Sequence, residues 1–232
     1  MLEELRQEIC QANQLLESSG LVKLTFGNVS GIDRDQGIFG IKPSGVAYAD
    51  LKPEQIVLID LEGKTVEGDL RPSSDTKTHL ELYRAWPSIG GVTHTHSIHA
   101  TSFAQAGRPL PCLGTTHADH FYGEVPVCRP LTPEEVEQDY EGHTGLAIIE
   151  HFEQHHIDPA TMPAVLQHHH APFSWGKNAM DSIKNSIALE VCAEMALSTF
   201  QLEPSTAAIP THILEKHHQR KHGANAYYGQ SS

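Results

Sequence analysis

The sequence predicts a mixed α/β fold in which helices cover a mostly antiparallel sheet. Short β-rich runs occupy residues 22–66 and return later in the chain, and long helical patterns without proline or glycine alternate with them. Neither an internal repeat nor a linker separates these segments. We therefore expect one domain over residues 1–232, a length that can bury a substantial core.

The first third of the chain predicts one helix followed by four strands. Apolar residues from Leu5 to Leu16 recur at helical spacing. Residues 22–42 are β-rich on both sides of a polar hairpin loop, and residues 56–66 predict a second pair of strands. This part of the chain is therefore expected to supply much of the sheet.

The remainder of the chain predicts helices separated by single strands. The run Thr132-Pro133-Glu134-Glu135 is typical of a helix start, because it supplies a cap, a proline at the first helical position and a glutamate at the third. The tail from His212 is too polar to be a core element. We expect helices over residues 76–86, 99–106, 133–151 and 178–199, and strands over residues 92–96 and 162–170.

Composition narrows the possible partners. The formal charge is −13, from 29 acidic and 16 basic residues, so the surface should repel nucleic acid and anionic membranes. The four cysteines form no C-x-x-C pair and are expected to be reduced, buried thiols. The N-terminus lacks the pattern of an export signal, and no apolar run approaches the ~20 residues of a membrane span. We expect a soluble, cytoplasmic protein.

Two histidines on one predicted strand suggest a metal site. His94 and His96 are two residues apart, so on a strand both imidazoles would point to the same face. The alternative is that both simply face solvent on an edge strand. His168 and His170 repeat the spacing on another predicted strand, and three protein ligands are typical of catalytic zinc. Asp75 is a candidate acidic ligand, with helix capping as its alternative role.

Motifs along nearly the whole chain resemble those of one protein family. In order, they are Phe26-Gly27-Asn28-Val29-Ser30, Lys42-Pro43-Ser44-Gly45, Pro72-Ser73-Ser74-Asp75, His94-Thr95-His96-Ser97, Gly114-Thr115-Thr116-His117-Ala118-Asp119, Pro172-Phe173-Ser174-Trp175-Gly176-Lys177-Asn178, Arg220-Lys221-His222-Gly223-Ala224 and Tyr227-Tyr228-Gly229-Gln230. The chain thus resembles the L-ribulose-5-phosphate 4-epimerases of the class II aldolase/adducin family.

The resemblance implies a fold, an assembly and a metal. It implies a three-layer α/β/α fold around a mostly antiparallel sheet, and a C4 homotetramer with active sites between subunits. It places Zn²⁺, or another divalent metal, on Asp75, His94, His96 and His170, and leaves His168 nearby. Related fuculose-phosphate aldolases carry glutamate where this chain has Asp75, a difference that favours the epimerase.

The implied reaction interconverts L-ribulose 5-phosphate and D-xylulose 5-phosphate. No carbonyl lies next to C4 to acidify its hydrogen, so the C3–C4 bond is broken and remade instead, with a metal stabilising the enediolate. By resemblance, Asp119 and Tyr228 move the protons, the latter from a neighbouring subunit. The alternatives are a turn or cap role for Asp119 and a docking role for Tyr228.

The substrate phosphate is expected among neutral donors. Ser73 and Ser74 precede a predicted helix, whose N-terminus favours an anion. Lys42 and His217 are weaker candidates, with a solvated strand position and a docking role as their alternatives. By resemblance Gly27, Asn28, Ser44 and Gly45 join the two serines, although each of these residues also suits an ordinary turn or cap.

Two other functions remain open on the sequence alone. A sister aldolase would cleave a phosphorylated sugar and release both fragments. A non-catalytic scaffold like the adducin head would use the same fold without a metal. The intact set of Asp75, His94, His96 and His170 argues against the scaffold.

Overall fold

An eight-stranded sheet organises the part of the chain that the computed structural model describes, residues 2–223 and 226–227. Its strands are β1 (Asn28–Asp33), β2 (Ile38–Ile41), β3 (Val57–Asp60), β4 (Thr65–Glu67), β5 (Gly91–His94), β6 (Val127–Cys128), β7 (Ala164–Gln167) and β8 (Pro172–Gly176). The strand order is β4-β3-β2-β1-β5-β8-β7-β6. Every neighbouring pair is antiparallel apart from β6 and β7. The expected mixed α/β class with a mostly antiparallel sheet is therefore confirmed.

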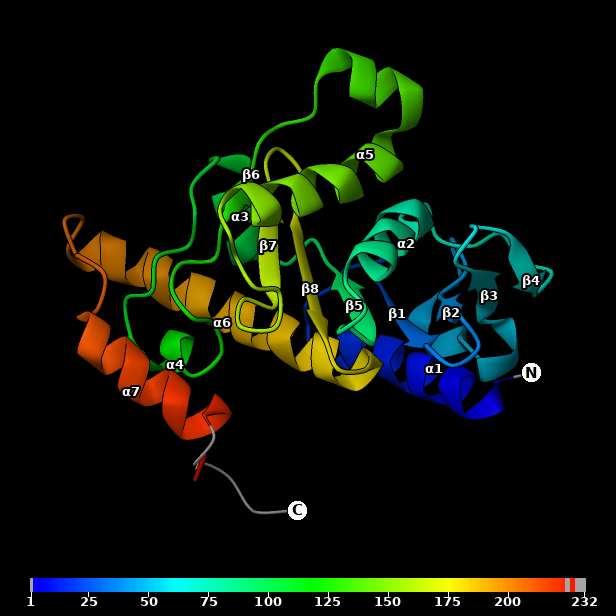
Figure 1. Cartoon of the computed structure of the whole chain (residues 1–232), viewed down its shortest axis with the longest axis horizontal. Coiled ribbons are helices and arrows are strands. Elements are labelled where there is room, and N and C mark those ends of the chain that lie inside the picture. The colour runs from blue at the N-terminus through cyan, green and yellow to red at the C-terminus, as the bar shows by residue number, and fades with distance from the viewer. Residues whose placement is uncertain (1, 224–225, 228–232) are drawn as a thin grey trace.

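Helices of very different length surround this sheet (Figure 1). They are α1 (Glu3–Ser18), α2 (Thr76–Ala85), α3 (Ile98–Gln105), α4 (Thr115–Ala118), α5 (Pro133–Gln154), α6 (Ala179–Leu202) and α7 (Thr211–His222), with short 3-10 turns at Tyr48–Asp50 and Pro53–Gln55. The helices α1 and α6 lie against each other, α1 on β1 and α6 on β5 and β8. The helices α2 and α5 pack together, and α7 packs on α4. No described helix has the length and apolar character needed to cross a membrane.

Two clusters of buried side chains make up the core. The larger one includes a tilted stack in which the ring centroids of Trp86 and Trp175 are 4.7 Å apart and Phe152 packs on both. The smaller one joins the apolar stripe of α1, with Ile9 and Leu16, to the sheet and α6. All four cysteines are buried and free, as the absence of C-x-x-C spacing predicts.

The structure corrects three expectations about the strands. The strand expected over residues 92–96 ends at His94, so His96 lies beyond it. Residues 162–170 were expected to form one strand, but β7 ends at Gln167 and residues 168–170 form a turn. His169 adopts a left-handed backbone with φ of 61°, which a strand cannot contain. After this turn the chain reverses into β8, a strand that the sequence analysis did not predict because its residues form a short apolar run without alternation.

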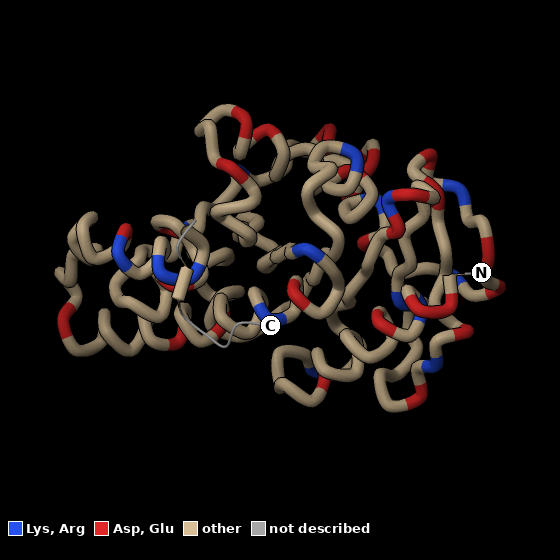
Figure 2. Tube along the Cα trace, turned by 60° about the horizontal axis from the view of Figure 1, so that its bottom comes forward, with Lys and Arg blue, Asp and Glu red and all other residues tan. Residues whose placement is uncertain are grey.

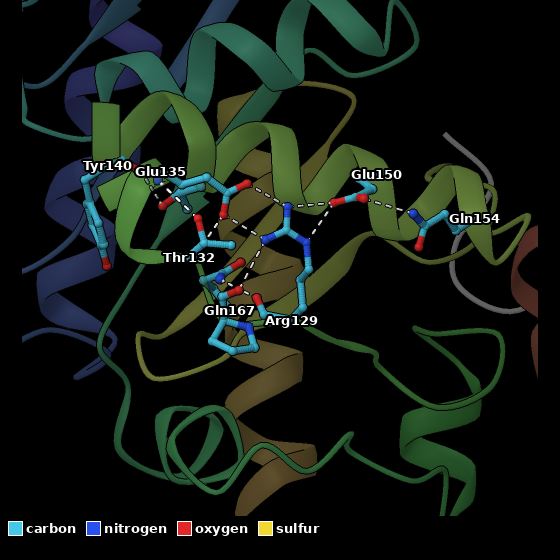
Figure 3. A network of polar contacts seen from close by, with 9 residues as sticks. Arg129, Thr132, Glu135, Tyr140, Glu150, Gln154 and Gln167 are labelled. Carbon is cyan, nitrogen blue, oxygen red and sulfur yellow. Dashed lines mark hydrogen bonds and ion pairs between the residues drawn. The ribbon is translucent and has the colours of Figure 1, made fainter. Parts of the chain in front are cut away.

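A network around Arg129 fixes the start of α5 (Figure 3). Its guanidinium forms ion pairs with Glu135 and Glu150, both on α5, and its carbonyl accepts a hydrogen bond from Gln167 at the end of β7. Thr132 and Glu135 form the predicted capping box. Further along, Asp139 departs from helical geometry (φ −165°, ψ 84°) and kinks the helix. The kink brings the residues after it to the edge of the cavity described next.

Candidate metal centre and substrate cavity

Three histidines meet where β1, β5 and β8 lie side by side. His94 ends β5 and pairs with Asn28 on one side and with Phe173 on the other. His96 lies two residues beyond β5, and His170 belongs to the turn just before β8. One ligand atom from each of the three lies within 4.8 Å of the others. The register of three neighbouring strands therefore joins residues 76 positions apart in sequence, from His94 to His170.

A hydrogen bond from Nδ1 of His94 to the backbone of Pro172 turns the other ring nitrogen, Nε2, toward the histidine cluster. Nδ1 lies 3.0 Å from the carbonyl oxygen of Pro172, and because a carbonyl only accepts, Nδ1 carries the proton. The lone pair of the neutral ring is then on Nε2, which lies 3.1 Å from Nε2 of His96. Carbonyl contacts of this kind commonly fix the tautomer of metal-binding histidines. The ring of Phe173, stacked 4.2 Å away, holds the imidazole plane.

Burial keeps these imidazoles uncharged. It lowers the pKa of His94 to about 3, with the neighbouring His96 contributing, and that of His170 to about 3. Partial desolvation at the cavity wall also lowers the pKa of His96, although this side chain remains exposed and the carboxylate of Asp75 opposes the shift. A neutral imidazole is the form that binds a metal, since its lone pair is available. At neutral pH all three histidines therefore present the binding form.

The three histidines fit a divalent metal. Ligand nitrogens about 2.0–2.1 Å from a tetrahedral metal lie roughly 3.3–3.4 Å from each other, close to the separation found between His94 and His96. Nδ1 of His170 is buried and has no hydrogen-bond partner among the described residues. A buried polar atom without a partner is costly unless an ion or water satisfies it. Both observations favour a cation bound by these side chains.

Asp75 lies beside the histidines and does not cap its helix. It occupies the N-cap position of α2, yet its side chain makes no capping hydrogen bond. The carboxylate instead accepts a 2.6 Å hydrogen bond from the amide of Asn28. Its charge raises the pKa of both His96 and His170 against the effect of burial. The capping alternative for Asp75 is therefore wrong, and a carboxylate is available at the edge of the histidine cluster.

A cavity of about 390 Å³ opens over the histidine cluster. Two loops lie next to each other on one side of it, because Pro43 and Pro72 form an isolated β-bridge. Gly27 has a φ of 91°, and a Cβ there would lie 2.6 Å from the carbonyl oxygen of His94, so this position requires glycine. Every residue expected to contact substrate or metal on this side lines the cavity: Gly27, Asn28, Ser44, Gly45, Ser73, Ser74, Asp75, His94, His96 and His170.

Lys42 is buried at this cavity, which rules out the solvated alternative. It is 2 % exposed, and its ammonium lies 4.8 Å from the ring centroid of Tyr48. Burial lowers its pKa. The described structure shows no ion pair for this ammonium. A buried cation at the cavity wall is suited to an anionic ligand.

Two residues that the sequence did not predict for the site line the same cavity. Tyr140 and Glu141 come from α5, directly after its kink at Asp139. The ring centroid of Tyr140 lies 5.9 Å from that of His170, and burial, aided by the charge of Asp75, raises the pKa of its phenol. Helical periodicity gives no signal for these residues, since the kink takes them out of the regular pattern.

Asp119 belongs to a separate cluster. Its carboxylate accepts hydrogen bonds from the guanidinium of Arg220, at 2.6 and 3.0 Å, and from His217 at 3.1 Å. Burial opposes ionisation, but these partners together lower the pKa of Asp119. Asp119 and His217 do not line the histidine cavity within the described chain, and neither does His168, which stacks on His169. Tyr228 lies outside the described residues.

Comparison with known proteins agrees with this geometry. Residues 7–197 match the class II aldolase and adducin N-terminal domain. An L-fuculose 1-phosphate aldolase superposes with a TM-score of 0.79 and 25% identity over 94% of this chain and 95% of that one. The L-fuculose-1-phosphate aldolase of Thermus thermophilus gives 0.68 and 25%, over 88% and 98%. YgbL from Klebsiella pneumoniae shares the fold, with 0.73 and 22%, over 93% and 99%. The chain belongs to the class II aldolase and adducin N-terminal domain family.

Proposed function

We propose that this protein is a metal-dependent L-ribulose-5-phosphate 4-epimerase. The observation that carries the proposal is the convergence of three neutral imidazoles at one end of a cavity that the carboxylate of Asp75 also lines. Backbone and hydroxyl donors and the buried Lys42 line the rest of that cavity. A phosphorylated ketopentose matches both parts, since its ketone and adjacent hydroxyl suit a cation and its phosphate suits the donors.

The chemistry required at C4 explains why a metal belongs in this site. Removal of the C4 hydroxyl proton lets the C3–C4 bond break, with its electron pair left on C3. The products are the enediolate of dihydroxyacetone and glycolaldehyde phosphate. A divalent cation on His94, His96, His170 and Asp75 supplies Lewis acidity, which stabilises the negative charge on the substrate oxygens. Rotation of the aldehyde and re-formation of the bond give the inverted C4.

The protein's own groups hold the two fragments in place between these steps. Ser44, Gly45, Ser73 and Ser74 lie on the two adjoining loops and are proposed to hold the phosphate with Lys42. Gly27 lies in the same cavity wall, and because glycine has no side chain, this position leaves space for the substrate. The carbonyl oxygen of the Asn28 side chain is buried without a hydrogen-bond partner among the described residues, so it can accept a bond from a substrate hydroxyl.

Proton transfer is proposed to come from a neighbouring subunit. Asp119 and Tyr228 would take and return the C4 hydroxyl proton on opposite faces. Asp119 sits in a charged cluster apart from the histidine cavity of its own chain, which supports a role at the cavity of another copy. We therefore propose a C4 homotetramer with active sites between subunits, built from a three-layer α/β/α protomer.

An aldolase acting on a phosphorylated sugar is the second candidate. Two L-fuculose-1-phosphate aldolases superpose at 25% identity, which favours this activity. The aspartate at position 75, where the sequence resemblance places glutamate in fuculose-phosphate aldolases, favours the epimerase. Both activities need the same cation and the same bond cleavage, so the two readings differ in whether the fragments rejoin before release.

One assay separates the candidates. The purified protein, loaded with Zn²⁺, is incubated with L-ribulose 5-phosphate, and D-xylulose 5-phosphate and free dihydroxyacetone are both followed. Accumulation of D-xylulose 5-phosphate supports the epimerase. Accumulation of dihydroxyacetone with glycolaldehyde phosphate supports the aldolase. Consumption of neither L-ribulose 5-phosphate nor L-fuculose 1-phosphate, by protein that holds its metal, would contradict both.

A further inference from the structure

A second cavity, of about 430 Å³, lies away from the histidine cluster. It is enclosed by the start of α6, the end of α7 and the loop at residues 159–163. None of its lining residues also lines the histidine cavity. Its volume falls in the range of about 300–1,000 Å³ that is typical of small-molecule sites. None of the residues proposed above to hold the metal or the substrate phosphate lines it.

Positive charge gathers at this cavity although the protein is acidic overall. Lys177, Lys184 and Lys221 line it together with one carboxylate, that of Asp181, so its lining carries a net charge of +2 against −13 for the chain. Figure 2 shows both acidic and basic residues spread along the trace, and the last turn of α7 carries Arg220 and Lys221. The cavity is therefore a local site for an anion on a surface that otherwise repels one.

The charges of Asp119 and Asp181 act on the Lys221 ammonium from nearby, but no carboxylate pairs directly with any of the three ammonium groups within the described chain. None of them forms a salt bridge there. The carboxylate of Asp181 already accepts a 3.0 Å hydrogen bond from the backbone N–H of Lys177. The ammonium of Lys221 instead lies 3.1 Å from Nε2 of His120, and burial lowers the pKa of both groups, that of His120 to about 4. The charged form of a partly buried lysine that has no ion pair is stabilised when an anion binds next to it.

Apolar side chains form the other part of the lining. Ile89 and Trp175 are almost fully buried, and Pro159 and Pro163 border them. The indole N–H of Trp175 donates to the carbonyl oxygen of Pro159 at 2.8 Å, so its polar group is already satisfied. A ligand that fills this part of the cavity therefore binds more tightly if it carries an apolar or aromatic group.

We propose that this cavity binds a small organic phosphate of nucleoside-monophosphate size, with its phosphate at the three lysines and its ring at the apolar lining. Lys184 is exposed and contributes charge to the rim, while Lys221 is half-buried beside His120. Lysine is a common point-charge partner of phosphate. The inference does not depend on the reaction proposed for the histidine cavity, although Lys221 and His222 of this lining adjoin Asp119.

Nuclear magnetic resonance of the full-length protein tests this binding. Trp175 lines the cavity, and the chain has only two tryptophans, so its indole N–H signal is readily assigned with a Trp86→Phe variant. AMP, adenosine and inorganic phosphate are titrated separately. We expect a saturable shift of the Trp175 indole with AMP, with a Kd of about 1 mM or tighter. Adenosine and phosphate, which each supply half of the ligand, should bind at least about tenfold more weakly.

Charge-matched variants assign the binding to this cavity. Lys184→Gln should weaken AMP binding about tenfold, the loss expected for one charge-assisted contact. Lys64→Gln removes the same charge from an exposed turn outside both cavities and should leave the affinity unchanged. Lys177→Gln, at another exposed position, is the second variant if Lys184→Gln lowers stability. The proposal is overturned if AMP gives no saturable shift, if the cavity variants and Lys64→Gln bind equally, or if phosphate alone binds as tightly as AMP.

Discussion

Replacing each of two neighbouring histidines by asparagine should separate metal binding from folding. His96 is exposed and its ring nitrogen faces the cluster, whereas His94 is 1 % exposed, donates to Pro172 and stacks on Phe173. Four-ligand zinc sites contribute about 10–16 kcal/mol, so one ligand is worth roughly 3 kcal/mol, or about 100-fold in affinity. Both His94→Asn and His96→Asn should therefore lose metal and activity together.

Only His94→Asn should also destabilise the metal-free protein. Loss of its buried hydrogen bond leaves the Pro172 carbonyl with only the 3.4 Å bond from the backbone N–H of Thr95, which costs about 0.5–1.5 kcal/mol, and loss of the stack with Phe173 adds about 0.5–1.5 kcal/mol. With a urea m-value of about 2 kcal/mol/M, the unfolding midpoint should fall by about 1 M. His96→Asn changes an exposed side chain and should stay within about 0.5 kcal/mol of the parent.

The two effects are measured separately. Metal content is determined by mass spectrometry after dialysis against Zn²⁺, and urea unfolding is followed in EDTA so that bound metal does not contribute. His156→Asn is the matched control, because this exposed histidine has a φ of 52°, which asparagine tolerates. A His96→Asn protein with full metal content and activity would refute the proposed centre. A His94→Asn protein as stable as the parent in EDTA would refute its packing role.

Three further predictions concern other groups. The carboxylate of Glu190 accepts backbone N–H bonds from His99 (2.9 Å) and Ala100 (3.0 Å), which outweigh its burial and lower its pKa. The ionised Glu190 carboxylate contributes about 1–2 kcal/mol to the free energy of unfolding at any pH above the pKa that this side chain has in the unfolded chain. This contribution is lost as the pH falls through the lower pKa of Glu190 in the folded protein. Glu190→Gln should therefore destabilise the protein in urea at pH 7 much more than at pH 3, and an equal effect at both would contradict this assignment. Lys42→Met should raise KM for the phosphorylated substrate at least about tenfold at unchanged metal content, because it removes the buried ammonium from the cavity wall; an unchanged KM removes Lys42 from phosphate binding. Asp119→Asn should keep the metal and lower kcat about 10²–10⁴-fold, and steady-state rates equal to those of the parent would exclude it from proton transfer.

Local patterns predicted most of the secondary structure. The apolar spacing of the first helix, the hairpin at residues 33–37 and the Thr132 capping box each depend on neighbours a few positions apart, and the structure contains all three. The turn at residues 168–170 was not predictable in this way. Its left-handed residue is a histidine and not the glycine that most often marks such a position in a sequence.

The sequence by itself determined the mixed α/β class and the acidic surface, because each follows from composition or from a short period. It also marked His94 and His96 as a pair, although β5 ends at His94 and the strand period does not reach His96. Only the tertiary structure decided that His170 joins His94 while His168 does not, that Asp75 turns from its helix toward Asn28, and that Lys42 is buried. These outcomes depend on which strands are neighbours and in what register. Strand pairing is set by packing between segments far apart in the chain, and no local pattern records it.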